Sequence, residues 1–308
     1  MSHILLGTHG GNTAVGAARI ARLLSERVHA PLDVVAVLVP PPIIDAGYGA
    51  VFVPDDTTMR EALQQLRTDA NAQLRSCGWT GNVSTTCIEG PPVRSILDEA
   101  REHRSDLIVV GLGSHQFIDR ALGGETALRL AQVSDVPVLA VPGTATELPH
   151  RVIAAIDFSD TSIEAAMLVA SWLTAGDVLL LAHVAPPTPS RGRTATGARD
   201  AESAPVRLPD VAKELAVPNG VTVTPIELTG DPARALLDLA EREHADLLAL
   251  GSHGYGMWKR FLLGSVASKV LRLATCSVLV VRPVRERAEM AATRAQLAGE
   301  EAATAHAS

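Results

Sequence analysis

Along the second half of the chain, short apolar runs of strand length alternate with segments of helical periodicity. The runs that predict strands are Val152–Ile156, Val178–Ala182, Val221–Leu228, Leu247–Leu250 and Val278–Val281. Between the first two runs, apolar residues recur at helical spacing. The segment Asp231–Glu243 predicts another helix, with Asp231 as its N-cap and Pro232 at its first position. This alternation is typical of a parallel sheet that is covered by helices on both faces.

The first half repeats this organisation, and apolar residues at helical spacing in it predict one long amphipathic helix from Met59 to Leu74. Ser105–Gly111 matches Ala245–Gly251 at an offset of 140 residues (245 − 105). Nearer the N-terminus, Ile4–Thr8 matches Ile153–Asp157 at an offset of 149 residues (153 − 4). A repeat of this size indicates a duplicated domain rather than a solenoid of short units.

The duplication predicts two tandem α/β domains, at residues 1–143 and 151–284, and a tail at 285–308 that is helical or disordered. Each domain is expected to contain an open parallel sheet of five strands in the order 3-2-1-4-5. In such a sheet, ligands bind at the carboxyl ends of the strands, where the strand order reverses.

Composition excludes several classes of function. The net charge is −7 and aromatic residues make up 3%, which argues against a nucleic-acid-binding surface. No apolar run approaches the roughly 20 residues of a membrane span, so we expect a cytoplasmic protein without a membrane partner. The cysteines and histidines show no metal-ligand spacing, so no metal site is predicted.

A glycine-rich segment in the second half points to a phosphate site. Gly251-Ser252-His253-Gly254 follows a predicted strand, and Gly264-Ser265 opens a predicted helix. Glycines let the backbone approach a ligand closely, and the N-terminus of a helix favours an anion. The hydroxyl of Ser265 can cap that helix or donate to a phosphate oxygen.

A carboxylate is expected opposite this loop. Asp157 ends the first strand of the second half and Gly251 ends the fourth. If the strand order is 3-2-1-4-5, these two strands are neighbours, and their ends flank the crevice. An alternative for Asp157 is that it only caps the helix that starts near Thr161.

The segment Gly251–Ala267 resembles the signature loop of ATP-binding universal stress proteins. Asp157-Phe158-Ser159 and Gly230-Asp231-Pro232 resemble the same family, and the resemblance extends over nearly the whole chain. It implies that ATP, with or without Mg²⁺, is the ligand. It also implies pairing of such domains, either within one chain or in a homodimer.

The resemblance further assigns roles to residues. Asp157 and Val184 would border the adenosine. The loop residues that would hold the ribose and phosphates are Ser252, His253, Gly254, Tyr255 and Gly256, together with Gly251. Gly264, Ser265 and Val266 would hold phosphates, and Arg260 is either a phosphate partner or a solvated side chain.

The first half departs from this pattern. At the offset of 149, Thr8 takes the place of the aspartate. At the offset of 140, Ser114 takes the place of the second loop glycine. Glu125 follows Gly124, where the family has Ser or Thr. A carboxylate at the N-terminus of a helix repels phosphate, so the first domain is expected to bind ATP weakly or not at all.

The sequence is compatible with three functions. The favoured one is an ATP-binding stress-response protein that regulates contacts with itself or with an unidentified protein partner. The second is a slow ATP hydrolase or phosphotransferase, although no catalytic residue is assigned. The third is a nucleotide-independent dimerisation scaffold, which the glycine motif argues against in the second half.

Overall fold

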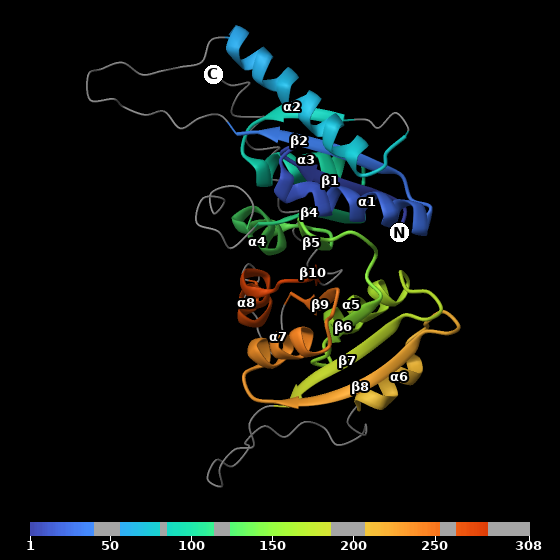
Figure 1. The fold of residues 1–308 in the computed structure, drawn as a ribbon. Helices are drawn as coiled ribbons and strands as arrows, with labels where there is room; N and C mark the ends of the chain where they lie inside the picture. Colours follow the sequence, from blue (N-terminus) through green and yellow to red (C-terminus); the bar gives the residue numbers. More distant parts are fainter. Residues whose placement is uncertain (40–55, 81–84, 114–123, 186–206, 253–262, 283–308) are drawn as a thin grey trace, which may run out of the picture. The chain divides into compact units, whose positions relative to one another are not determined.

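The computed structural model describes residues 1–39, 56–80, 85–113, 124–185, 207–252 and 263–282. The chain divides into two compact units, Met1–Leu148 and Pro149–Pro283, to the extent that these residues are described (Figure 1).

The first unit alternates strands and helices, as its sequence predicts. Its elements are β1 (Ile4–Thr8), α1 (Val15–Val28), β2 (Leu32–Leu38), α2 (Asp56–Ser76), β3 (Thr85–Glu89), α3 (Pro92–Glu102), β4 (Leu107–Leu112), α4 (Gly124–Val133) and β5 (Val138–Pro142). A short 3-10 turn, η1 (Asn12–Ala14), precedes α1. The strands are parallel and their order is β3-β2-β1-β4-β5.

The second unit has the same order of elements. They are β6 (Arg151–Ala155), α5 (Asp160–Ala170), β7 (Val178–Ala185), α6 (Leu208–Glu214), β8 (Thr222–Thr229), α7 (Pro232–Arg242), β9 (Leu247–Gly251), α8 (Ser265–Leu273) and β10 (Ser277–Val281). The strand order is β8-β7-β6-β9-β10, again parallel throughout. The predicted fold class and the 3-2-1-4-5 order are therefore confirmed in both units.

Helices cover both faces of each sheet. In the first unit, α1 and α2 contact each other on one face of the sheet, and α3 and α4 contact each other on the opposite face (Figure 1). In the second unit, α7 contacts α8. The central strands β1, β4, β6 and β9 are almost wholly buried, as expected for strands enclosed by two helical layers. Among the helices of the described residues, none is both long enough and apolar enough to span a bilayer.

Two local predictions are also confirmed. Asp231 is the N-cap of α7, because its Oδ1 accepts a hydrogen bond from the backbone N–H of Arg234 at 3.0 Å. Lys269 Nζ also lies 3.0 Å from this oxygen, and these two donors lower the pKa of Asp231. The long amphipathic helix predicted from Met59 to Leu74 is α2, which buries Leu66, Ala70 and Leu74.

One buried carboxylate fixes the turn that leads into β7. Asp177 accepts hydrogen bonds from the backbone N–H of Thr174 at 2.6 Å and from its hydroxyl at 3.1 Å. His150 Nδ1 lies 2.6 Å from the other carboxylate oxygen. Burial alone would raise the pKa of Asp177, but these hydrogen bonds outweigh it, and the pKa is lowered.

Replacing Asp177 with Asn should therefore destabilise the second unit in a pH-dependent way. At pH 7 we expect a loss of about 1–3 kcal/mol, because hydrogen bonds to a buried charged group are lost. A lowered carboxyl pKa stabilises the folded state above the ordinary value of about 3.9, and that contribution disappears as pH falls through the lowered pKa. Urea unfolding from pH 7 down to pH 3 should show the gap between wild type and Asp177→Asn closing only below about pH 4. A gap that is unchanged at pH 3 would contradict this.

Candidate functional site

A cavity of about 290 Å³ opens at the carboxyl ends of β6, β7 and β9 and at the N-terminus of α8. The structure brings seven of the residues singled out in the sequence to its wall: Asp157, Val184, Gly251, Ser252, Gly264, Ser265 and Val266. His253, Gly254, Tyr255, Gly256 and Arg260 lie outside the described residues. The cavity is where the reversal of strand order places a binding crevice.

Asp157 is held in one orientation by the turn that begins α5. Its Oδ1 accepts hydrogen bonds from the backbone N–H of Ser159 at 3.0 Å and from the Ser159 hydroxyl at 2.5 Å. Ser159, and not Asp157, is the N-cap of α5 and accepts from the N–H of Ser162. The capping alternative for Asp157 is therefore wrong, since Asp157 orients the cap rather than being the cap. Its carboxylate is fixed at the cavity wall.

Gly251 has a packing role that the sequence did not indicate. A Cβ atom at this position would lie 2.6 Å from Thr161 Oγ1 and 3.1 Å from the backbone nitrogen of Ser162. Only glycine lets the first turn of α5 pack this closely on the end of β9. The absent side chain thus brings the Asp157 turn and the loop after β9 together.

The N-terminus of α8 is anchored to the same loop. The N–H of Gly264 donates to the Ser252 carbonyl at 2.7 Å, and the N–H of Ser252 donates to the Val281 carbonyl at 2.7 Å. Gly264 is the N-cap residue and has no side chain with which to cap α8, and Ser265 is exposed. The first N–H groups of a helix have no partner within the helix, so this uncapped end can receive an anion.

His183 is a lining residue that the sequence analysis did not select. Its Nδ1 lies 2.7 Å from the Ile156 carbonyl, which can only accept, so Nδ1 carries a proton, and in the neutral ring Nε2 is the acceptor. Its ring also packs against Phe158, with centroids 4.7 Å apart. The available signal was a polar residue at the carboxyl end of an otherwise apolar strand, Val178–Ala182.

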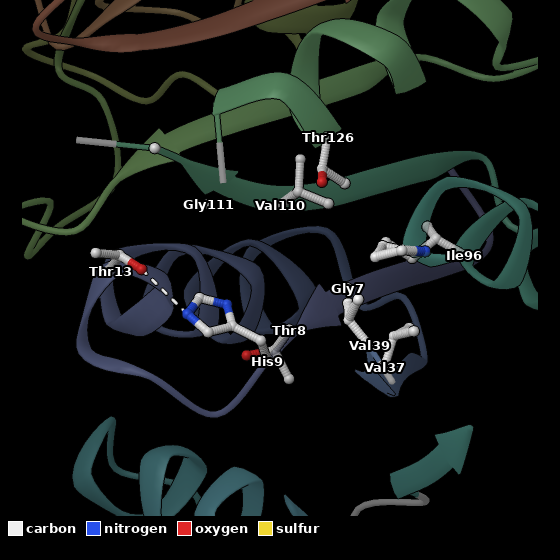
Figure 2. Close-up of a pocket in the computed structure, with 12 residues that line it drawn as sticks. Gly7, Thr8, His9, Thr13, Val37, Val39, Ile96, Val110, Gly111 and Thr126 are labelled. Carbon is white, nitrogen blue, oxygen red and sulfur yellow. Dashed lines mark hydrogen bonds between the residues drawn. The ribbon is translucent and has the colours of Figure 1, made fainter. Parts of the chain in front are cut away.

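The first unit has a cavity in the corresponding place, with a volume of about 50 Å³ (Figure 2). Equivalent elements line it: Val37 on β2 matches Val184 on β7, and Gly111 on β4 matches Gly251 on β9. Thr126 stands where the second unit has Val266. The cavity is much smaller, although the framework around it is the same.

Strand pairing corrects the alignment of the two halves near the N-terminus. Ile4 pairs with Leu107, whereas Val152 pairs with Leu247, the residue 140 positions after Leu107. Ile4 therefore corresponds to Val152, which is an offset of 148 (152 − 4) and not 149. The counterpart of Asp157 is His9.

Backbone conformation and burial support this correction. Gly10 and its counterpart Phe158 both have positive φ, at 76° and 63°. Thr8 is only 6% exposed and donates to Gln73 Oε1 on α2 at 2.7 Å, so it is a core residue. His9 is exposed on the cavity wall, where its Nε2 lies 3.2 Å from Thr13 Oγ1 (Figure 2).

Glu125 lies in the first turn of α4 and is exposed, where it forms an ion pair with Arg129 one turn further on. The negative charge at the start of this helix is thus partly balanced by an arginine of the same helix. It still occupies the end at which an anionic ligand would bind, which disfavours phosphate there. Ser114 lies outside the described residues.

Comparison with known proteins places this fold in a family. The family model of universal stress proteins matches residues 1–142 and again residues 149–282. The chain belongs to the universal stress protein family, with two domains in tandem.

A universal stress protein of Mycolicibacterium smegmatis is 27% identical over 301 residues, covering 91% of this chain and 97% of that protein. Universal stress protein YxiE of Bacillus subtilis is 42% identical over 71 residues, but this match covers only 23% of this chain and 48% of that protein. A universal stress protein crystal structure from Archaeoglobus fulgidus superposes with a TM-score of 0.60 at 19% identity, covering 91% of this chain and 96% of that one. That likeness shows the shared fold.

The corrected alignment predicts opposite outcomes for two aspartate substitutions. Thr8→Asp places a charge in the core beside Gln73 and should cost about 2–4 kcal/mol of unfolding free energy. His9→Asp introduces the same charge at an exposed site and should change stability by less than about 0.5 kcal/mol. Urea unfolding of the two variants tests the correction, and equal losses would contradict it.

Proposed function

We propose that the second unit binds ATP, and that the protein acts as a nucleotide-responsive regulator in the stress response. The observation that supports ATP is that one cavity wall holds both a feature that attracts anions and a feature that attracts hydrogen-bond donors. The uncapped N-terminus of α8 favours phosphate oxygens, and the fixed carboxylate of Asp157 favours hydroxyl and amino donors. A nucleotide presents these groups at its two ends.

The rest of the wall suits the middle of such a ligand. Val184, Leu236 and Leu250 supply apolar surface for a flat base, and His183 Nε2 adds an acceptor. Of the described residues that line the cavity, Asp157 is the only carboxylate. Any Mg²⁺ that enters with ATP would accordingly be held mainly by the phosphates.

Binding is proposed in preference to turnover. The described part of the wall offers two candidate bases, Asp157 and the Nε2 atom of His183, but both hydrogen bonds from Ser159 fix Oδ1 of Asp157 as an acceptor for the helix cap. Release of inorganic phosphate from ATP and Mg²⁺, measured at saturating ATP, separates the two functions. Sustained turnover that is lost in Asp157→Asn would replace the binding proposal with the hydrolase.

The regulatory role is the further part of the proposal. ATP would change how the protein pairs with a second copy, how its own domains pair, or how it binds another protein in the cytoplasm. A ligand shifts such an equilibrium only if it binds one state more tightly than the other. Sedimentation of the protein with and without ATP tests the self-association, and identical profiles would remove that route.

Gly264→Glu should lower the affinity for ATP by at least about a hundredfold, or about 2.7 kcal/mol. The substitution puts a carboxylate at the N-terminus of α8, as Glu125 does at α4, and repulsion then replaces attraction for the phosphates. The φ of Gly264 is −55°, so the backbone accepts a side chain without strain. Titration calorimetry of the full-length protein measures the effect.

Two matched variants control this experiment. Gly264→Ser adds a side chain without charge and should keep most of the affinity, since it introduces no repulsion for the phosphates. Glu125→Ser alters the equivalent helix of the first unit and should leave the affinity of the second unit unchanged. If Gly264→Glu and Gly264→Ser bind ATP as wild type does, the site is wrongly assigned.

Asp157→Asn should lower the affinity for ATP by about tenfold while the fold is retained. The Asn oxygen can still accept from Ser159, but the charge that strengthens a hydrogen bond to the ligand is gone. Thermal unfolding without nucleotide should match wild type to within a few degrees. An unchanged affinity would show that Asp157 does not contact the ligand.

A further inference from the structure

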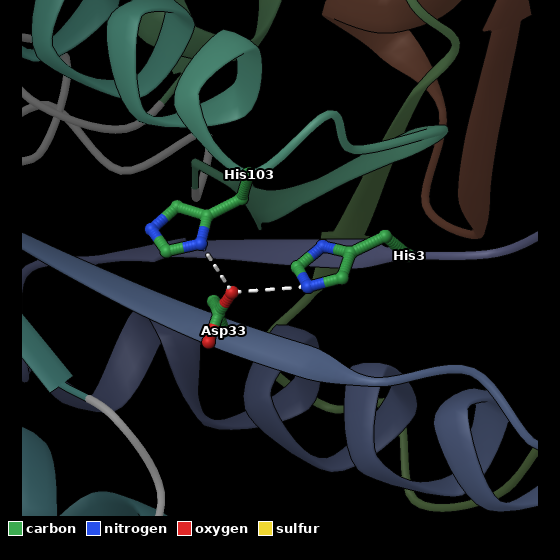
Figure 3. A group of neighbouring side chains, drawn as sticks. All are labelled: His3, Asp33 and His103. Carbon is green, nitrogen blue, oxygen red and sulfur yellow. Dashed lines mark ion pairs between the residues drawn. The ribbon is translucent and has the colours of Figure 1, made fainter.

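A cluster of two histidines and an aspartate lies at the amino ends of the strands of the first unit, at the end of the sheet opposite the cavity (Figure 3). His3 directly precedes β1, Asp33 is the second residue of β2, and His103 is the C-cap of α3. One side-chain donor atom from each lies within 4.8 Å of the others. The three residues are far apart in sequence, so their spacing gave no sign of the cluster.

Both imidazole rings point at the same carboxylate oxygen (Figure 3). Asp33 Oδ2 lies 3.0 Å from His3 Nε2 and 2.7 Å from His103 Nδ1. The rings are stacked, with centroids 5.8 Å apart and an angle of 10° between their planes. Two ligands bound to one tetrahedral zinc ion lie about 3.4 Å apart, so an ion would have to lengthen the two aspartate–histidine distances by about half an ångström. The two ring nitrogens, which lie within 4.8 Å of each other, would have to reach the same spacing.

The outer nitrogen of each ring also has a partner. His103 Nε2 lies 3.5 Å from Glu99 Oε2, and His3 Nδ1 lies 3.4 Å from Ser105 Oγ. Histidines that bind metals almost always direct the second ring nitrogen to a carboxylate or another oxygen, which fixes the ring and its tautomer. Here that outer arrangement is present around both rings.

We propose that His3, Asp33 and His103 bind one divalent transition-metal ion, with Zn²⁺ as the preferred class. Two imidazoles and one carboxylate suit zinc, and three protein ligands leave a fourth position for water or another donor. The side chains are 18%, 19% and 30% exposed, so an ion can reach them from solvent. The ion would tie together the start of the chain, β2 and the end of α3.

The second unit shows that the fold itself does not require this cluster. The residues at the equivalent positions are Arg151, Leu180 and Glu243, from the strand register and the offset of 140. Arg151 NH1 and Glu243 Oε2 form an ion pair at 3.6 Å, and Leu180 is buried. At the same end of the sheet, the second unit thus has an ordinary ion pair, whereas the first unit presents metal ligands.

The simpler alternative is a hydrogen-bonded cluster in which Asp33 bridges two histidines and no ion binds. The test uses full-length protein without a histidine tag, stripped with a chelator and titrated with Zn²⁺ by calorimetry. We expect one bound ion per chain and a higher midpoint of thermal unfolding. Co²⁺ in place of Zn²⁺ should give a visible ligand-field spectrum, which a hydrogen-bonded cluster cannot produce.

Variants locate the ion. Asp33→Asn and His103→Gln should each lower the affinity for Zn²⁺ by at least about tenfold, and Glu99→Gln by about tenfold through loss of the outer hydrogen bond.

His150→Gln is the matched control, because His150 also lies beside a carboxylate, that of Asp177, and the variant should bind Zn²⁺ as wild type does. Should Asp33→Asn fail to fold, His103→Gln decides, since it lies at a helix end. Absence of Zn²⁺ binding, or unchanged affinity in the folded ligand variants, overturns the proposal.

Discussion

The pairing of the first and fourth strands of each unit is the constraint on which the rest of the structure depends. Ile153 pairs with Leu248 in the second unit, so the strand that leads to Asp157 and the strand that ends in Gly251 run side by side. Because the chain leaves these strands toward opposite faces, their carboxyl ends flank a crevice. The cavity, the fixed carboxylate and the uncapped helix all follow from that one pairing and its parallel direction.

Most of the fold could be predicted because every level of the sequence agrees on it. Apolar runs, helical spacing and the Asp231-Pro232 cap independently indicate the same alternation of strands and helices. The duplication then fixes the same strand order twice. The site was harder to predict than the fold. The sequence placed Asp157 and Gly251 at one edge of the sheet, but whether His183 lines the cavity depends on which way that strand residue faces. The packing of Gly251 on Thr161 depends on a distance between elements that only the folded structure gives.

The offset of 149 failed for a physical reason. Matching by residue type placed Thr8 on Asp157, because both are polar and both end an apolar run. Strand register is set by backbone pairing, which a sequence match does not detect, and a shift of one residue exchanges a core position with an exposed one. Thr8 is accordingly buried against Gln73, while His9 takes the wall position.

The two ends of the first unit now have different chemical characters. At the carboxyl ends of its strands, a small cavity with Glu125 at the adjacent helix disfavours a phosphate ligand. At the amino ends, His3, Asp33 and His103 lie close together, whereas the equivalent residues of the second unit are Arg151, Leu180 and Glu243. Strand ends tolerate such changes because loops and element termini bear little of the core packing. After duplication of one fold, each copy can therefore keep or lose ligand-binding residues at either end of its sheet. We expect the two copies to have diverged in what they bind while they keep the same sheet.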